Sequence, residues 1–231
     1  PRSTLFPYTT LFRSLLNNLN RSNEVTIKFA VVHSLSSTFF SKFLRLFPDY
    51  IKDFKIELVA ANVGEGFKLL KEGACDFLIC YSDETKLKAI NSDVLTHLKL
   101  GDTEIVPVTL IDEDGNAKYD INHRFPLLSY SKNAYLRNLV DQVISNKLEY
   151  RILYETDHAN NLKDFVLQGA GIAWLPKITI EEDLLKKKLK IINAREYIIK
   201  QQIFIFKNKI RKDDYLKIFW DSLRNIEFNT D

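Results

Sequence analysis

Short strand-like runs and amphipathic helical segments alternate from residue 25 almost to the end of the chain, and this pattern limits the fold more than any other feature. The runs VTIKFAVV (residues 25–32) and DFLICY (residues 76–81) are typical of strands. Residues 34–47 and 65–72 have the apolar spacing of helices. Strands that alternate with helices predict βαβ units, and the chain is therefore expected to have an α/β fold.

The first expected helix, at residues 34–47, begins at Ser34 and ends before Pro48. A serine at a helix start accepts a hydrogen bond from a free backbone N–H, and a proline cannot continue a helix. A polar, turn-rich segment at residues 112–122 then separates two series of such units. The other expected strands are 55–63, 95–100, 104–110, 126–130, 150–155, 171–175 and 197–206, and the other expected helices are 134–145, 160–168, 179–188 and 213–225.

The composition is that of a folded protein, and 231 residues are enough for two lobes. The 33 basic and 30 acidic residues are well mixed, which indicates no strong nucleic-acid or membrane surface. No apolar run of about 18 residues can span a bilayer, and the N-terminal sequence does not resemble an export signal. The only cysteines are Cys75 and Cys80, too few for a disulfide framework. We therefore expect a cytoplasmic protein.

Three segments resemble the effector-binding domain of LysR-type transcriptional regulators. The most specific is VLQGAGIAWLP (residues 166–176), which matches a recurrent pattern of valine, Gly-x-Gly and Leu-Pro in that family. IKFAVVHSLSSTFF (residues 27–40) and LLKEGACDFLICYSD (residues 69–83) agree with it in order and spacing. The resemblance implies two α/β lobes with two crossover strands, similar to type 2 periplasmic binding proteins. It also implies a small-molecule effector in the cleft between the lobes.

The resemblance also implies how the chain is organised. Its N-terminal winged helix-turn-helix is expected to be missing, so the chain is interpreted as a fragment that contacts DNA only through that absent domain. The opening residues resemble a non-native leader, and the sequence has no methionine at all. The expected parts are residues 1–14 as the leader, 15–24 as a remnant of the linker helix, 25–110 as lobe 1, 111–196 as lobe 2 and 197–226 as a return to lobe 1.

Polar side chains follow several of the expected strands, where ligands bind in α/β sheets. Helix N-termini there favour an anion, so we expect an anionic effector. Ser34 has an alternative role as a helix cap only, and a lone loop lysine such as Lys132 is more often simply solvated. Cleft-lining and effector-binding roles are expected for Ser34, Ser36, Ser82, Ser129, Ser131, Lys132 and Thr156.

Catalytic and metal-binding roles are not indicated. The sequence has no Gly-x-Ser-x-Gly, His-Glu-x-x-His or Gly-x-x-x-x-Gly-Lys motif, and its histidines do not pair at metal-ligand spacing. We therefore expect no cofactor. A bridge between Cys75 and Cys80 is also disfavoured, because an extended span of that length covers about 16 Å whereas a disulfide needs Cα atoms within about 7 Å.

Two other functions remain open on this scaffold: a free-standing solute-binding protein, which would need an export signal, and an enzyme. The resemblance further implies self-association as a homodimer or tetramer through helices of the first lobe. Phe39, Phe40, Phe43 and Leu44 carry more apolar surface than one inward-facing stripe needs, so this helix is the expected interface.

Overall fold

The computed structural model describes residues 25–47, 54–83, 87–88, 90, 93–192, 195–211 and 213–224. The expected leader and linker helix at residues 1–24 lie outside these residues. The chain divides into two compact units: unit 1 contains Pro1–Val32, Phe39–Gly101 and Ile203–Asp231, and unit 2 contains His33–Thr38 and Asp102–Gln202. Two long strands, β4 (Leu95–Leu110) and β9 (Ile199–Asn208), contribute residues to both units.

Unit 1 is built on a sheet whose strand order is β2, β1, β3, β9, β4. The first three strands are β1 (Thr26–Val32), β2 (Lys55–Ala61) and β3 (Phe77–Ser82), and β1 pairs in parallel with both of its neighbours. Parallel strands need crossover connections, and α4 (Val63–Glu72) lies in the connection that leads from β2 past β1 to β3. This arrangement confirms the expected α/β fold for the unit.

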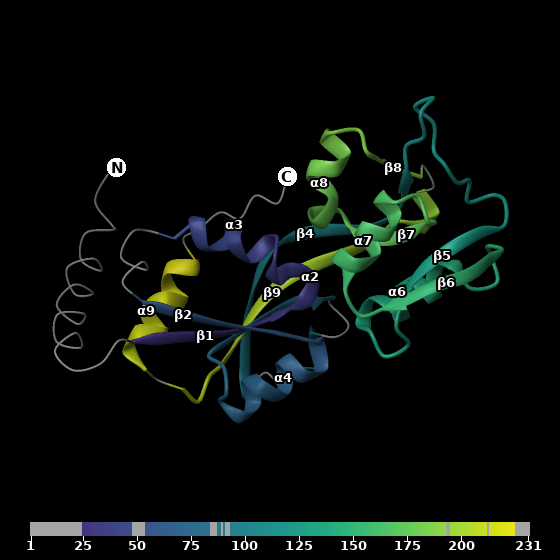
Figure 1. The fold of residues 1–231 in the computed structure, drawn as a ribbon. Coiled ribbons are helices and arrows are strands. Elements are labelled where there is room, and N and C mark those ends of the chain that lie inside the picture. Colours follow the sequence, from purple (N-terminus) through teal and green to yellow (C-terminus); the bar gives the residue numbers. More distant parts are fainter. Residues whose placement is uncertain are drawn as a thin grey trace. The chain divides into compact units, whose positions relative to one another are not determined.

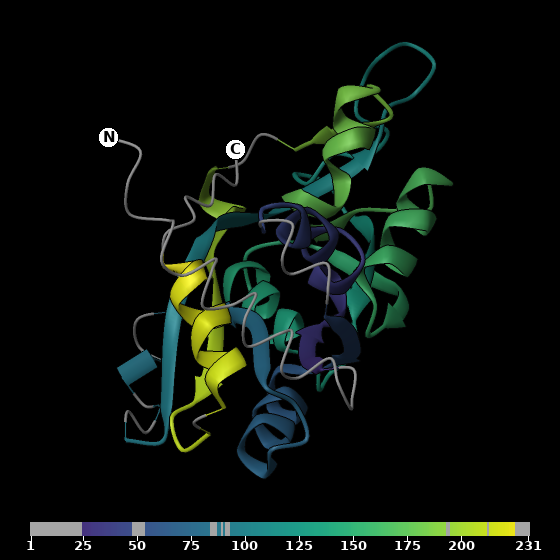
Figure 2. The same cartoon turned by 90° about the vertical axis from the view of Figure 1, so that its left-hand side faces the viewer.

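The alternation of side chains along β3 explains how helices cover both faces of this sheet. Phe77 contacts Phe219 of α9 (Asp214–Leu223), whereas the next residue, Leu78, faces Gly66 of α4. Figure 1 shows α9 and α4 on opposite sides of the unit 1 strands, and the side view of Figure 2 brings α9 in front of them. Both faces are thus buried, as the apolar sequence of β3 predicts.

An aromatic cluster fills the face toward α9 and corrects the expected interface. Phe29 of β1 contacts the rings of Phe40, Phe43, Phe77 and Phe219. Phe39, Phe40 and Phe43 are at most 5% exposed, and Leu44 is half-buried. The apolar surface assigned to a dimer is therefore core of unit 1, because α9, distant in sequence, packs against this segment.

The expected continuous helix at residues 34–47 is wrong, because the structure has two short helices, α2 (His33–Ser36) and α3 (Phe39–Arg45). The hydroxyl of Ser36 donates to the carbonyl oxygen of His33 at 2.8 Å, and that of Thr38 donates to the carbonyl oxygen of Ser34 at 3.3 Å. Hydroxyls that bond to nearby backbone carbonyls compete with the regular helix pattern. Ser34 is consequently inside α2 rather than its cap.

Unit 2 contains the parallel pair β5 (Phe125–Tyr130) and β6 (Tyr150–Thr156), with Tyr130 opposite Thr156 in register. The crossover between these strands is α6 (Tyr135–Ile144). The remaining elements are α7 (Ala159–Leu167), β7 (Ala173–Pro176), α8 (Lys177–Leu185), β8 (Leu189–Ile191) and a short 3-10 helix, Arg195–Tyr197; β7 and β8 pair antiparallel with β4.

Two glycines of VLQGAGIAWLP occupy positions that restrict the residue type. Gly169 follows α7 with a φ of 73°, a left-handed conformation that glycine adopts without strain. At Gly171 a Cβ atom would lie 2.4 Å from the carbonyl oxygen of Pro126, so only glycine fits against β5. Pro126 in turn accepts a hydrogen bond from the N–H of Ile172 at 2.9 Å. The motif therefore joins α7 to β5.

Most other expected elements are present within a few residues of their expected ends. One correction concerns residues 95–100 and 104–110, which were expected as two strands but form the single strand β4. Cys75 and Cys80 are both buried, and no disulfide joins them. Within the described residues, no helix is long and apolar enough to cross a membrane.

Candidate functional site

The carboxyl ends of β5 and β6 meet at one edge of unit 2. The N–H of Ser131, directly after β5, donates to the carbonyl oxygen of Thr156, the last residue of β6, at 3.0 Å. The chain continues from Thr156 into α7, and the side chain of its N-cap residue His158 forms no capping hydrogen bond. The first N–H groups of α7 are therefore the partial positive charges at this edge.

The short helix α2 lies against α7 in the same unit (Figure 1). The amide Nδ2 of Asn160 donates to the hydroxyl of Ser37 at 3.1 Å. Beside this bond, the rings of His33 and His158 are in contact, with centroids 4.6 Å apart and planes at 84°. We call these four residues, His33, Ser37, His158 and Asn160, the α2–α7 junction. It brings segments more than a hundred residues apart to the carboxyl end of β6.

The structure brings most of the predicted effector-binding residues into unit 2. Ser34 and Ser36 belong to α2, Ser131 follows β5, and Thr156 ends β6. The Thr156 hydroxyl accepts hydrogen bonds from the His158 N–H at 3.3 Å and from Asn161 Nδ2 at 3.4 Å. Direct binding of an effector by these side chains remains a prediction.

Lys132 and Ser82 differ in environment from the serines of α2. Lys132 is exposed next to Ser131, and among the described residues no carboxylate forms an ion pair with it. Ser82 belongs to unit 1, where it ends β3 and is 2% exposed. A contribution of the Lys132 charge to effector binding remains a prediction.

Ser129 is bound into an internal network centred on Arg137 of α6. Nη1 of Arg137 donates to the Ser129 hydroxyl at 2.9 Å, to the carbonyl oxygen of Tyr130 at 2.9 Å and to Glu155 at 2.7 Å. Its Nε donates to Asp141 at 2.7 Å. Burial by itself favours the neutral form, but the hydrogen bonds and charges of Asp141 and Glu155 raise the pKa of Arg137. The guanidinium thus fixes the end of β5 in place.

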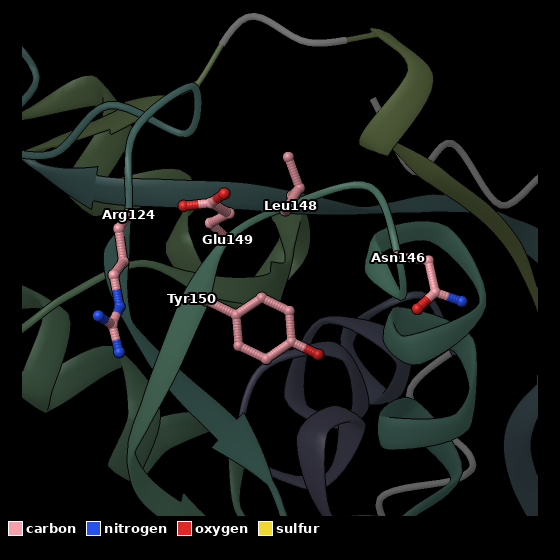
Figure 3. A pocket seen from close by; sticks show the side chains of 5 residues that line it. All are labelled: Arg124, Asn146, Leu148, Glu149 and Tyr150. Carbon is pink, nitrogen blue, oxygen red and sulfur yellow. The ribbon is translucent and has the colours of Figure 1, made fainter.

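The opposite end of these strands carries a shallow surface pocket of about 470 Å³ (Figure 3). Its lining residues precede or begin β5 and β6, and none of them was predicted to bind the effector. Ligands in α/β sheets bind at the carboxyl ends of strands rather than at this amino end. The lining residues are Arg124, Asn146, Leu148, Glu149 and Tyr150.

Sequence reasoning missed His158, Asn160 and Arg137 as parts of this edge. The one sequence signal for Arg137 is its place among the apolar residues of an amphipathic helix, because an arginine at such a position is seldom buried unless it is paired. The contact of His33 with His158 has no counterpart in sequence spacing. Within the part of the chain described here, no cluster of three or more histidine, cysteine or acidic side chains could hold a metal ion.

Comparison with known proteins identifies the family. Residues 20–226 match the family described as the LysR substrate binding domain. The chain is 31% identical over 208 residues to the HTH domain-truncated transcriptional regulator QseD of Escherichia coli O157:H7, and the match covers 87% of this chain and 81% of QseD. It is equally similar to the HTH-type transcriptional regulator YjiE of Escherichia coli K12, of which it spans 65%.

Solved structures of HypT from Salmonella typhimurium have the same fold. The bromide-bound regulatory domain of HypT is 26% identical with a TM-score of 0.77, and the match covers 88% of this chain and 96% of that one. Full-length HypT, described as a hypochlorite-specific LysR-type transcriptional regulator, is 27% identical with a TM-score of 0.78 and is matched over 94% of this chain and 74% of its own. These relatives are regulators and not enzymes. The chain therefore belongs to the LysR family of transcriptional regulators and contains its substrate-binding domain.

Proposed function

We propose that this effector-binding domain recognises a small anion at the carboxyl ends of β5 and β6 in unit 2. The observation that carries the proposal is the meeting of hydroxyl groups, an exposed lysine and the uncapped start of α7 at this edge. Hydroxyls and helix N–H groups donate hydrogen bonds to an anion, and an ammonium group adds charge. The proposed contacts are Ser34, Ser36, Ser131, Lys132 and Thr156, with Ser129 as a further predicted lining residue of the same unit.

The main positive end belongs to α7 rather than to α2. A helix of nine residues such as α7 aligns more peptide dipoles than the four-residue α2 does. Ser34 is buried at 7% exposed, and the Ser36 hydroxyl bonds to the backbone of its own helix. The serines of α2 would therefore hold α2 in place beside the anion as well as contact it. The bromide bound to HypT, a protein 26% identical to this one, supports a small anion as the class of ligand.

A binding screen tests the anion. The chain would be titrated with bromide, chloride, hypochlorite and small carboxylates at constant ionic strength, and its melting temperature recorded. A ligand that binds only the folded state raises the melting temperature by mass action. We expect at least one anion to raise it in a saturable manner. A screen in which no anion does so would refute the proposal.

Two variants locate the site once an anion is found. Lys132→Ala removes the exposed charge and should weaken binding by about tenfold, while Lys147→Ala, an exposed lysine elsewhere in unit 2, should not. Ser34→Ala is expected to cost about 0.5–3 kcal/mol of binding if the hydroxyl contacts the anion. Unchanged binding by Lys132→Ala, measured well below its melting temperature, would count against this edge.

We further propose that the chain self-associates and that the intact regulator acts on DNA in the cytoplasm through an N-terminal helix-turn-helix domain. Among the described residues, β2 pairs only with β1 and β6 only with β5, and both outer strands expose apolar side chains. Leu58 and Val59 are 38% and 51% exposed, and Ile152 and Leu153 are 38% and 48% exposed. Open strand edges with apolar side chains favour pairing with a second chain.

Sedimentation at micromolar concentration tests the assembly. We expect a dimer or tetramer, and a smaller species after Val59→Lys or Leu153→Lys, because a charge on an open strand disfavours pairing. Leu185→Lys changes an isolated leucine of α8 that is 83% exposed and should leave the assembly intact. A wild-type chain that sediments as a monomer would contradict self-association.

A further inference from the structure

We propose that the α2–α7 junction is a binding site for a borderline divalent transition-metal ion, such as Zn²⁺, Ni²⁺ or Cu²⁺, held by the imidazoles of His33 and His158. This site goes beyond the anion binding proposed above and does not depend on it. The first observation is the ring contact itself, with centroids 4.6 Å apart. Two imidazoles that share one metal ion at metal–nitrogen distances of about 2.0–2.1 Å have ring centres within about 5 Å of each other.

The second observation is a buried oxygen without a donor in the same junction. Oδ1 of Asn160 is buried and accepts no hydrogen bond, although Nδ2 of the same amide donates to Ser37. A buried acceptor without a donor is rare in folded proteins, and a bound ion or water often satisfies such an atom. An amide oxygen together with two imidazoles would give a mixed nitrogen and oxygen donor set, which suits these metals and disfavours Mg²⁺ and Ca²⁺.

The junction is also fixed in the way that a metal site requires. His33 begins α2 and is half-buried, whereas His158 is the exposed N-cap of α7, so solvent reaches the pair from one side. The Asn160–Ser37 hydrogen bond ties together the same two segments that carry the histidines. Preorganised ligands bind a metal ion at lower entropic cost than ligands on mobile loops. Water would complete the coordination of such a two-histidine site.

Calorimetric titration of the whole chain with each metal chloride tests the proposal. We expect saturable binding of one ion per chain, with Cu²⁺ bound more tightly than Ni²⁺ or Zn²⁺ and no binding of Mg²⁺. Acidification should weaken binding, because an imidazole coordinates a metal ion only in its neutral form. A wild-type chain that binds none of the three transition metals below millimolar concentration would overturn the proposal.

Matched variants separate coordination from simple ring packing. His33→Phe keeps an aromatic ring against His158 but removes the nitrogen ligands, and His158→Gln changes an exposed side chain with little risk to folding. Each should lose about tenfold or more in affinity for Cu²⁺. His123→Ala, which alters an exposed histidine paired with Asp120, should bind as the wild type does.

The nitrogen signals of bound Cu²⁺ in electron paramagnetic resonance give a second readout. Signals from two imidazoles in the wild type, reduced to one in His33→Phe, would support the site. Unchanged affinity and signals in both His33→Phe and His158→Gln would show that the metal binds elsewhere and would overturn the proposal.

Discussion

Each unit contains one arginine bound to a buried network, but the two networks join different parts of the chain. In unit 1, Arg211 pairs with Asp76 at the amino end of β3, and Asp76 also accepts a hydrogen bond from the Lys28 N–H at 2.8 Å. In unit 2, Arg137 binds Asp141 on its own helix. It also binds Glu155 and the end of β5, which lie close to it in the sequence. The first network closes a long-range contact, whereas the second secures the strand ends beside the proposed anion site.

The accessibility of the acids differs between the networks as well. The Asp76 side chain is 3% exposed, whereas those of Asp141 and Glu155 are 37% and 40% exposed. An acid that loses its partner in the interior cannot be rehydrated, but one near the surface can. We therefore expect that the stability of unit 1 depends on its network and that the network of unit 2 mainly orders local structure.

The largest effect is expected from Asp76→Ala. This change leaves the N–H of Lys28 without its acceptor and removes the buried partner of Arg211, which keeps only its pair with Asp213, and it should lower the free energy of unfolding by about 3 kcal/mol. Asp76→Asn retains an acceptor and should lower the free energy of unfolding less. Urea denaturation measures both values, with the exposed ion-pair variant Glu57→Gln as the control that should change little. Equal losses for Asp76→Ala and Glu57→Gln would remove the distinction between buried and exposed pairs.

A smaller loss of about 1–2 kcal/mol is expected from Arg137→Met, because Asp141 and Glu155 regain water. The change should nevertheless loosen the end of β5. Hydrogen exchange at the Ser131 N–H, which bonds to the carbonyl oxygen of Thr156, is the measurement. Arg151→Met, at an exposed position of β6, is the matched control. If the Ser131 N–H were equally protected from exchange in the wild type, Arg137→Met and Arg151→Met, Arg137 would not order this edge.

The smallest effect concerns the thiol next to the unit 1 network. Burial raises the pKa of Cys75 to about 11, and the nearby charge of Asp76 adds to the increase. Relative to an ordinary thiol, this leaves about a hundredfold less thiolate at pH 8, so disulfide reagents should react slowly. Because folding raises the pKa of Cys75, the protonated thiol contributes fully to the stability of the folded state below pH 9.0, the ordinary pKa of a thiol. This contribution is lost as the pH rises through about 11.

In a Cys80→Ala background, Cys75 is the only thiol that reacts with a disulfide reagent. Its reaction rate then shows how each network affects access to Cys75. Asp76→Ala should accelerate the reaction of Cys75 by opening the unit 1 network, while Arg137→Met in unit 2 should not. Acceleration by both variants would mean that the two networks open together rather than separately.

The helix–strand alternation determined most elements of both units, because apolar periodicity is a local property that burial then satisfies. The motif VLQGAGIAWLP was likewise recognisable from the sequence, and the structure adds that Gly169 is left-handed and that Gly171 lies close to the backbone of Pro126. The break between α2 and α3 was missed because serine and threonine hydroxyls compete with helix bonds in a way that periodicity does not register.

Only the tertiary structure decided which polar groups share an edge. The sequence predicted that hydroxyls would gather at strand ends, but the contact of His33 with His158 and the bond of Asn160 to Ser37 join segments 123 or more residues apart. It also decided that Ser129 donates and accepts hydrogen bonds inside the unit, because Arg137 reaches it from α6. Such pairings depend on how whole elements pack, and a local sequence pattern does not indicate which distant element will pack against it.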